Sequence, residues 1–167
     1  MLLRKDNGGT SLIELVIAMA IAAIILSMLM FFISGAANSF RIASDDVNLQ
    51  MEAQTTINQL TNLAMEAETM TSHTNMADVR YIFRYSDTEY YAVVFNNSEN
   101  ILYLIKESTE DLANTAATVM NQHFMAEYVS SLVMDLSPNG KTVTINLELT
   151  LGQDSYQMSK KVKMRNA

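Results

Sequence analysis

Residues that could carry acid, base, nucleophilic or metal chemistry are few in this chain, and they are scattered. His73 and His123 are 50 residues apart, and neither has a second ligand at a metal-binding spacing. The absence of cysteine excludes disulfides, thiolate metal sites and a cysteine nucleophile. Asp45 and Asp46 lack the ligand spacing and the glycine of a calcium loop. We therefore expect no catalytic residue, no metal, no cofactor and no enzyme activity.

Glu14 is the chemically distinctive residue, because it lies inside an almost wholly apolar block. The block runs from Leu12 to Ile33, and only Glu14 and Ser27 of its 22 residues are not apolar. A carboxylate at the edge of a membrane-spanning segment is unfavourable, and a plain membrane anchor gains nothing from it. The charge therefore indicates a partner for Glu14 within or beside the membrane.

The apolar block itself predicts a helix that spans a membrane. The segment Leu15–Ile33 carries no charge, and as a helix its 19 residues extend about 28 Å, which matches a bilayer core of about 30 Å. It is apolar on every face, unlike a helix that lies on a membrane surface. Arg4 and Lys5 precede it and an acidic region follows, which predicts an N-terminus inside the cytoplasm.

The region after the block is acidic and resembles an ordinary globular head. From Ser34 onward there are 16 acidic and 9 basic residues, and the whole chain has a net charge of −7. A nucleic-acid interface needs a surface rich in lysine and arginine, so we expect no clear nucleic-acid binding. The one basic cluster is at the C-terminus, and it is more typical of a solvated edge strand than of a binding patch; it comprises Lys160, Lys161, Lys163 and Arg165.

A family resemblance rests on the run Gly9-Thr10-Ser11-Leu12-Ile13-Glu14-Leu15 and the apolar block that follows it. The run resembles the prepilin signal of the type IV pilin family. The resemblance implies cleavage between Gly9 and Thr10 by a prepilin peptidase, N-methylation of Thr10, and retention of the apolar helix in the mature chain. Glu14 stands where the family has its acidic residue. The amine of Thr10 in a neighbouring subunit is the natural cation for it, and the pair would set the register of assembly.

The resemblance also implies a division of the chain into three parts. Residues 1–9 would be a cleaved leader, residues 10–34 a transmembrane and later filament-core helix, and residues 35–167 an extracytoplasmic head. Many major pilins carry a proline where Phe31 stands here, and its absence favours a minor subunit. The precursor would sit in the cytoplasmic membrane with its N-terminus inside, and the mature chain in a filament or on the cell surface.

The head is predicted to be α+β, with an amphipathic continuation of the helix over residues 34–70 and an antiparallel meander after it. The apolar half of the helix would protrude, and the amphipathic half would pack on the head. The helix stripe expected to face the head comprises Phe40, Ala43, Val47, Ala53, Ile57, Leu60, Ala64 and Ala67. After residues 71–75 the periodicity is expected to change to that of strands, and residues 111–121 are expected to form a short helix. Strands are predicted at 79–85, 89–95, 101–106, 128–136, 142–151 and 156–164, with a hairpin turn at 137–140.

These observations favour a minor pilin-like structural subunit, with the membrane, a prepilin peptidase, other pilin subunits and an assembly platform as partners. One alternative is a pseudopilin of a DNA-uptake or type II-like secretion machine. Another is a single-pass membrane protein with an extracellular binding head. A secretory signal cleaved near Ser34–Ala37 is a third.

Overall fold

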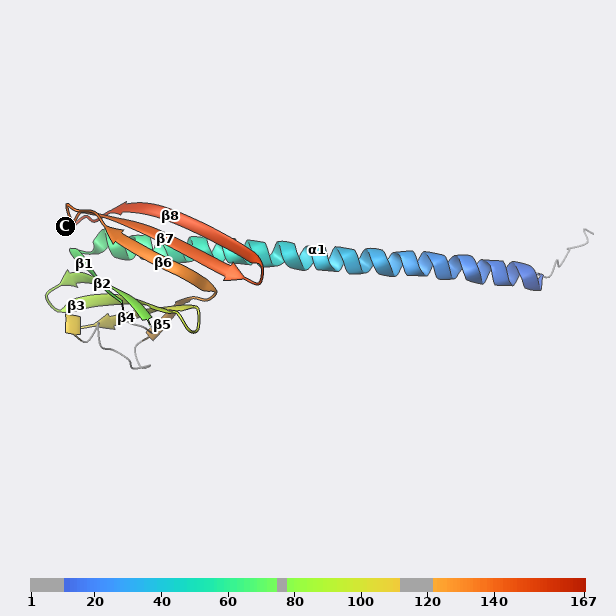
Figure 1. Ribbon diagram of the computed structural model, residues 1–167, viewed down its shortest axis with the longest axis horizontal. Coiled ribbons are helices and arrows are strands. Elements are labelled where there is room, and N and C mark those ends of the chain that lie inside the picture. Colours follow the sequence, from blue (N-terminus) through green and yellow to red (C-terminus); the bar gives the residue numbers. More distant parts are fainter. Residues whose placement is uncertain (1–10, 75–77, 112–121) are drawn as a thin grey trace, which may run out of the picture. The chain divides into compact units, whose positions relative to one another are not determined.

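The computed structural model describes residues 11–74, 78–111 and 122–167. Within these ranges the chain forms one long helix followed by eight strands in two antiparallel sheets, which confirms the α+β prediction (Figure 1). The chain divides into two compact units, Met1–Ser44 and Asp45–Ala167. The short helix predicted at 111–121 lies almost wholly outside the described residues.

Helix α1 spans Leu12–Glu66, and its side chains change environment along its length. In the first unit every described residue from Ser11 to Ala43 is exposed. In the second unit the helix buries one stripe with helical spacing. That stripe comprises Leu49, Ala53, Thr56, Ile57, Leu60, Thr61 and Ala64.

The predicted stripe was right from Ala53 onward and wrong before it. Phe40 is 76% exposed and Val47 is 52% exposed, and Ala43 is exposed as well. The buried stripe starts instead at Leu49. Periodicity alone placed the boundary too early, because apolar side chains fit an exposed apolar segment as well as a buried stripe.

The five-stranded sheet has the order β1-β2-β3-β4-β5, with every neighbouring pair antiparallel. The three central strands match the predicted meander. The helix ends at Glu66 rather than at residue 70, and the strands begin earlier than predicted, with β1 at Thr69–Thr74 pairing with β2. The strands are β1 (Thr69–Thr74), β2 (Asp78–Ser86), β3 (Glu89–Asn96), β4 (Ile101–Glu107) and β5 (Gln122–Ala126).

The three-stranded sheet has the order β6-β7-β8 and is also antiparallel. It comprises β6 (Val129–Leu136), β7 (Thr142–Leu151) and β8 (Asp154–Lys163), close to the predicted bounds. On β7 the residues Val143, Ile145, Leu147 and Leu149 are buried and alternate with half-buried polar ones, as expected. The predicted hairpin turn is confirmed, since Gly140 has a φ of 70° and donates its N–H to the carbonyl of Ser137.

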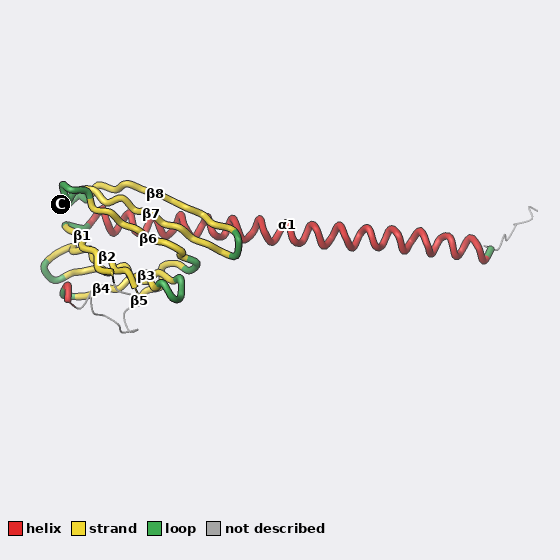
Figure 2. The backbone as a smooth tube through the Cα atoms, viewed as in Figure 1, coloured by secondary structure: helices red, strands yellow, loops and turns green. Residues whose placement is uncertain are grey.

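One apolar core joins α1 to both sheets within the second unit. Its members include Ile57 and Leu60 from the helix, Phe83 from the five-stranded sheet, and Ile145 and Leu147 from the three-stranded sheet. Figure 2 shows the end of α1 running between the two groups of strands. The helix is therefore covered by a sheet on each of two sides, which is why Ile57, Leu60 and Ala64 are fully buried.

The C-terminal residues close the end of α1. The Arg165 N–H donates to the Met65 carbonyl over 2.9 Å, and the Asn166 side-chain amide donates to the Glu66 carbonyl over 2.7 Å. The last carbonyls of a helix have no partner within it, so these two bonds satisfy groups that the helix leaves open. They also fix where β8 ends relative to the helix.

Candidate functional site

The expected processing site, Gly9 and Thr10, lies outside the described residues. The structure describes the chain from Ser11, which immediately precedes α1. Glu14 lies in the first turn of that helix. The described part of the candidate site is therefore the helix start and the apolar surface behind it.

Ser11 and Glu14 form a reciprocal capping box at the start of α1. The Ser11 N–H donates to Glu14 Oε2 over 2.8 Å, and the Glu14 N–H donates to Ser11 Oγ over 3.3 Å. Each side chain thus satisfies a backbone donor that the first turn leaves open. A carboxylate at this position also interacts favourably with the positive end of the helix dipole.

The cap gives Glu14 a role that the sequence analysis missed. The expectation that an anchor gains nothing from this carboxylate was wrong, because the carboxylate defines where the helix begins. The signal was present as the pattern Ser-x-x-Glu ahead of an apolar run, which is typical of a helix N-terminus. Glu14 therefore has a structural partner within its own chain, and any partner from another chain would act on a carboxylate already held in place.

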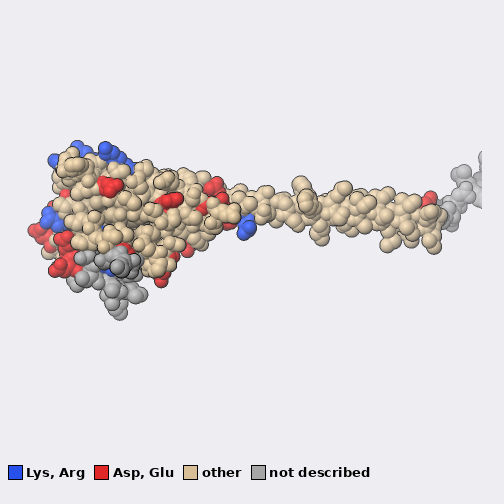
Figure 3. Space-filling view, viewed as in Figure 1, with Lys and Arg blue, Asp and Glu red and all other residues tan. Residues whose placement is uncertain are grey.

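The surface behind the cap is apolar and exposed on all sides. Phe31 is 84% exposed, Leu12 82% and Phe32 73%. Ser27, the one polar residue in the middle of the segment, donates its hydroxyl to the Ile24 carbonyl over 2.7 Å and so hides its polarity within the helix. The helix is long and apolar enough to cross a membrane. Figure 3 shows this segment as uncharged surface, with an acidic side chain near its start.

The other residues considered for chemistry are not brought together. His73 is half-buried on β1, and His123 is exposed on β5. Among the described residues no three His, Asp or Glu side chains converge as metal ligands. Asp46 is exposed and accepts a hydrogen bond from Gln50 at 3.5 Å, which is an ordinary contact on a helix surface.

A hollow of about 370 Å³ lies between α1 and the five-stranded sheet, but its groups serve the fold. The Tyr85 hydroxyl donates to the Leu63 carbonyl over 3.1 Å, and the Tyr85 and Tyr91 rings are 4.7 Å apart. Burial, followed by the charge of Glu66, raises the pKa of Tyr85 well above its ordinary value of 10.0. A phenol held neutral and bonded to a backbone carbonyl ties the helix to the sheet.

The comparisons with known proteins bear on the N-terminal segment. The prokaryotic N-terminal methylation motif matches residues 4–30, a span that includes the Ser11–Glu14 cap and most of the exposed apolar segment. No curated protein and no solved structure matches the chain. The matched motif is a structural motif of the pilin type rather than an enzyme signature. The methylation motif, on a capped apolar helix, supports a type IV pilin-like protein.

Proposed function

We propose that the chain is a minor pilin-like structural subunit of a type IV pilus or a related filament. A prepilin peptidase would cut between Gly9 and Thr10, remove the leader 1–9 and leave Thr10 as the methylated N-terminus. Residues 10–34 would hold the precursor in the membrane with its N-terminus inside, and would later pack in the filament. Residues 35–167 would form the extracytoplasmic head.

The observation that carries this proposal is the methylation motif on a helix whose apolar surface is exposed all round. In water such a surface is strongly unfavourable, since apolar area gains free energy when it leaves water. Lipid covers it in the precursor, and like helices cover it in a filament. Because both surroundings are apolar, the helix can pass from one to the other with little change in solvation.

Glu14 is the residue proposed to set the register between subunits. Cleavage would create an amine at Thr10, one residue before Ser11 of the capping box. We expect that amine to pair with Glu14 of a neighbouring subunit. An ion pair in an apolar environment is favourable only when both partners are present and well placed, so a misplaced subunit would leave a charge unpaired.

The first experiment determines the N-terminus of the membrane-bound chain by mass spectrometry. The proposal expects Thr10, with the mass of one methyl group added. Replacing Gly9 with a bulky residue should block cleavage, because glycine lets the scissile segment enter a narrow cleft in extended form. An N-terminus at Met1 would indicate a simple membrane anchor, and one after Ala36 would indicate a secreted protein.

The second experiment separates the charge of Glu14 from its capping role. Glu14→Gln keeps a side chain that can cap the helix but removes the charge, whereas Ser11→Ala removes the hydroxyl that caps the Glu14 N–H and keeps the charge. We expect Glu14→Gln and Glu14→Ala to be cleaved normally but incorporated poorly, and Ser11→Ala to be incorporated nearly as well as the wild type. Normal incorporation of Glu14→Gln would refute the register role.

A further inference from the structure

The positive charges of the second unit fall into two groups. Three of its eight lysine and arginine residues lie in ion pairs: Arg80 with Asp78 at 2.8 Å, Arg84 with Glu68 at 3.2 Å, and Lys106 with Glu89 at 2.6 Å. The other five line a single hollow of about 640 Å³, which contains no Asp or Glu side chain. We call it the basic hollow; its cations are Lys141, Lys160, Lys161, Lys163 and Arg165.

Local structure accounts for only part of this concentration of charge. Lys160 donates to Asn58 Oδ1 over 3.3 Å, and lysines on the edge strand β8 discourage pairing with another sheet. The hollow also lies beside the last turn of α1, whose dipole is worth about half a charge. That half charge does not balance five cations, and edge protection does not require Lys141, which precedes β7. The hollow therefore has an excess of positive charge that an anionic partner would neutralise.

The same unit carries an acidic patch that we define as Asp45, Asp46, Glu52 and Glu127. The Glu127 N–H donates to Glu52 Oε1 over 2.6 Å, which brings the strand connection against the helix. Partial burial raises the pKa of Glu52, and the nearby Glu127 charge adds to the effect. The Glu127 charge is also the main cause of the raised pKa of Tyr128. Among the described residues no lysine or arginine forms an ion pair with this patch.

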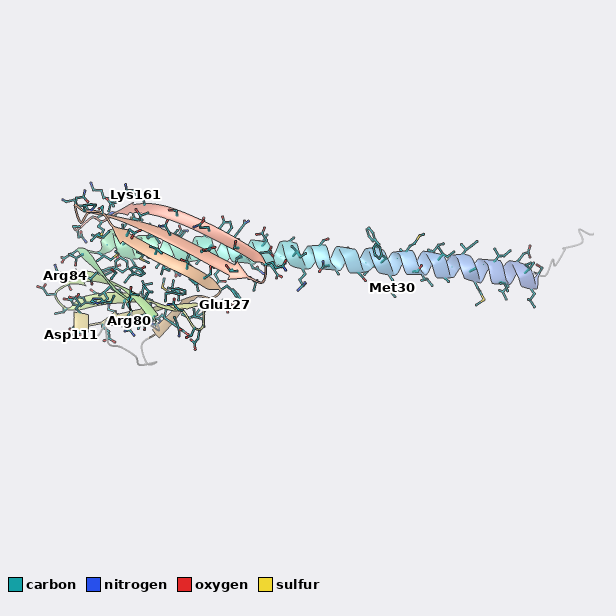
Figure 4. The ribbon with its side chains drawn as sticks, in the orientation of Figure 1. Met30, Arg80, Arg84, Asp111, Glu127 and Lys161 are labelled. Atoms are coloured by element: carbon teal, nitrogen blue, oxygen red, sulfur yellow. The ribbon has the colours of Figure 1, made fainter. Side chains whose placement is uncertain are left out.

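The two charged regions lie toward opposite ends of the second unit. On helix α1, Glu52 belongs to the acidic patch, whereas Met65 lines the basic hollow. The two residues are 13 positions apart on the helix, which corresponds to about 20 Å along its axis. Figure 4 shows the same separation between Glu127 and Lys161, and in Figure 3 lysine and arginine side chains gather over the end of β8. One copy cannot bring its own patches together, but two copies displaced along the helix can.

A second copy fits the basic hollow better than a polyanion or a membrane does. Residues 45–167 contain 16 acidic and 8 basic residues, so their net charge of −8 repels a polyanion at long range. The hollow has no aromatic side chain on which a base could stack. Of its apolar side chains, Val162 and Met164 are buried, Met65 is half-buried and Ala167 is small, so no large exposed apolar side chain is available to insert into a lipid surface. Another copy, in contrast, presents the acidic patch, in which Asp45, Glu52 and Glu127 all lie near Tyr128.

We propose that the basic hollow of one copy docks on the acidic patch of a second copy. The contact uses different surfaces on the two partners, so it leaves a free patch and a free hollow at the ends and can continue from copy to copy. It rests on the proposed function and deepens it, because it assigns a head-to-head contact to an assembly otherwise held by helices.

The test uses chemical cross-linking of the full-length chain, which contains no native cysteine. Two differently tagged forms, Ser159→Cys beside the hollow and Ser130→Cys beside the patch, retain every charge and are expressed together in a membrane that supports processing. A short flexible bis-maleimide should link the two forms to each other more efficiently than it links either form to itself. Added salt should lower the yield, since exposed charges are screened.

Charge reversal then tests whether the two patches cause the link. A hollow variant carries Lys161→Glu and Lys163→Glu, and a patch variant carries Asp46→Lys and Glu127→Lys; all four residues are exposed. Reversing the same region in both tagged forms should lower the yield roughly fivefold, as two exposed attractions become repulsions. When the Ser159→Cys form carries the hollow variant and the Ser130→Cys form carries the patch variant, the two reversed regions attract again, and the cross-linking yield should recover. The matched control, Asp87→Lys with Glu110→Lys, should not change it.

Several outcomes would overturn the inference. The wild-type chain could give no cross-link between the Ser159→Cys and Ser130→Cys forms, or the cross-linking yield could be unaffected by either charge reversal. The yield could also fail to recover when a hollow variant is mixed with a patch variant. A cross-link lost on nuclease treatment would make nucleic acid the bridge. Normal cleavage at Gly9 and incorporation of the reversed variants with an unchanged yield would reject this contact and leave the proposed function standing. Failure of wild-type processing or incorporation would reject both.

Discussion

Helix α1 is one continuous element, yet its two halves meet different surroundings. From Leu12 to Ala43 its residues are exposed, whereas from Leu49 to Ala64 a stripe is buried against two sheets. The first half is apolar on every face from Leu15 to Ile33, and the second has one apolar face only. The difference shows that the first half depends on lipid or other chains for burial, while the second half carries its own cover.

A complete loss of membrane retention is expected from placing a charge in the uncovered half. Ile25→Asp puts a carboxylate near the middle of the apolar segment, where insertion scales give a cost of about 2.5–3.5 kcal/mol. We expect the variant to be lost from the carbonate-resistant membrane fraction, while near-ultraviolet circular dichroism of the head tyrosines is unchanged. Ile25→Leu is the control. Full membrane retention of Ile25→Asp would contradict an apolar environment for this half.

Truncating a leucine to alanine should change the free energy of unfolding much more in the covered half of α1 than in the uncovered half. Leu60 is fully buried and Leu29 is 50% exposed. Leu60→Ala should lower the free energy of unfolding of the head by about 2–5 kcal/mol, because it leaves a cavity in the core. Leu29→Ala should change it by less than about 0.5 kcal/mol. Thermal unfolding of the full chain in detergent measures both, and equal effects would show that the halves are not distinct.

The cap at Ser11 is expected to act only at the start of the uncovered half. Ser11→Ala removes the bond to the Glu14 N–H and should cost about 1 kcal/mol in local helix stability. Hydrogen exchange should speed up for the amides of the first turn and remain unchanged in residues 49–64. Ser27→Ala, which alters a bond within the helix interior, is the control. Unchanged exchange in the first turn would mean that another group caps the helix.

The covered half contains one polar group whose removal should help. Thr56 is fully buried, and its hydroxyl has no hydrogen-bond partner among the described residues. Thr56→Val replaces the hydroxyl with a methyl group of similar size and should raise the free energy of unfolding by about 1 kcal/mol. Thr61→Val should not, because the Thr61 hydroxyl donates to the Ile57 carbonyl over 2.6 Å. A loss of stability in Thr56→Val would reveal a partner for that hydroxyl.

The smallest expected effect is the pH dependence contributed by Glu52. Burial raises its pKa above 4.5 in the folded chain, so the folded state holds this proton more tightly than the unfolded state does. Its contribution to stability therefore increases as the pH falls through the raised pKa toward 4.5. Glu52→Gln keeps an acceptor for the Glu127 N–H and should remove that part of the profile, measured as melting temperature against pH. If melting temperature depended on pH in the same way in Glu52→Gln as in the wild type, the predicted contribution of Glu52 would be contradicted.

Strand predictions succeeded where the burial pattern lay within the strand itself. The bounds predicted for β7 are those found, since apolar and polar residues alternate along it from Val143 to Leu149. Strands β1 and β5 were missed. The sequence of β1 is mostly polar, with only Met70 buried, so it is held by pairing with β2 rather than by a pattern of its own. Strand β5 has five residues and pairs with β4 through an irregular register.

The sequence by itself carried the methylation motif at residues 4–30 and the apolar block from Leu12 to Ile33. Both are local patterns, so the order of residues along the chain suffices to find them. Only the tertiary structure decided that α1 lies between two sheets from Leu49 onward. It alone also brought Lys141 beside the lysines of β8 and Glu127 beside Glu52. Those contacts depend on strand order and on residues far apart in sequence, which no local pattern specifies.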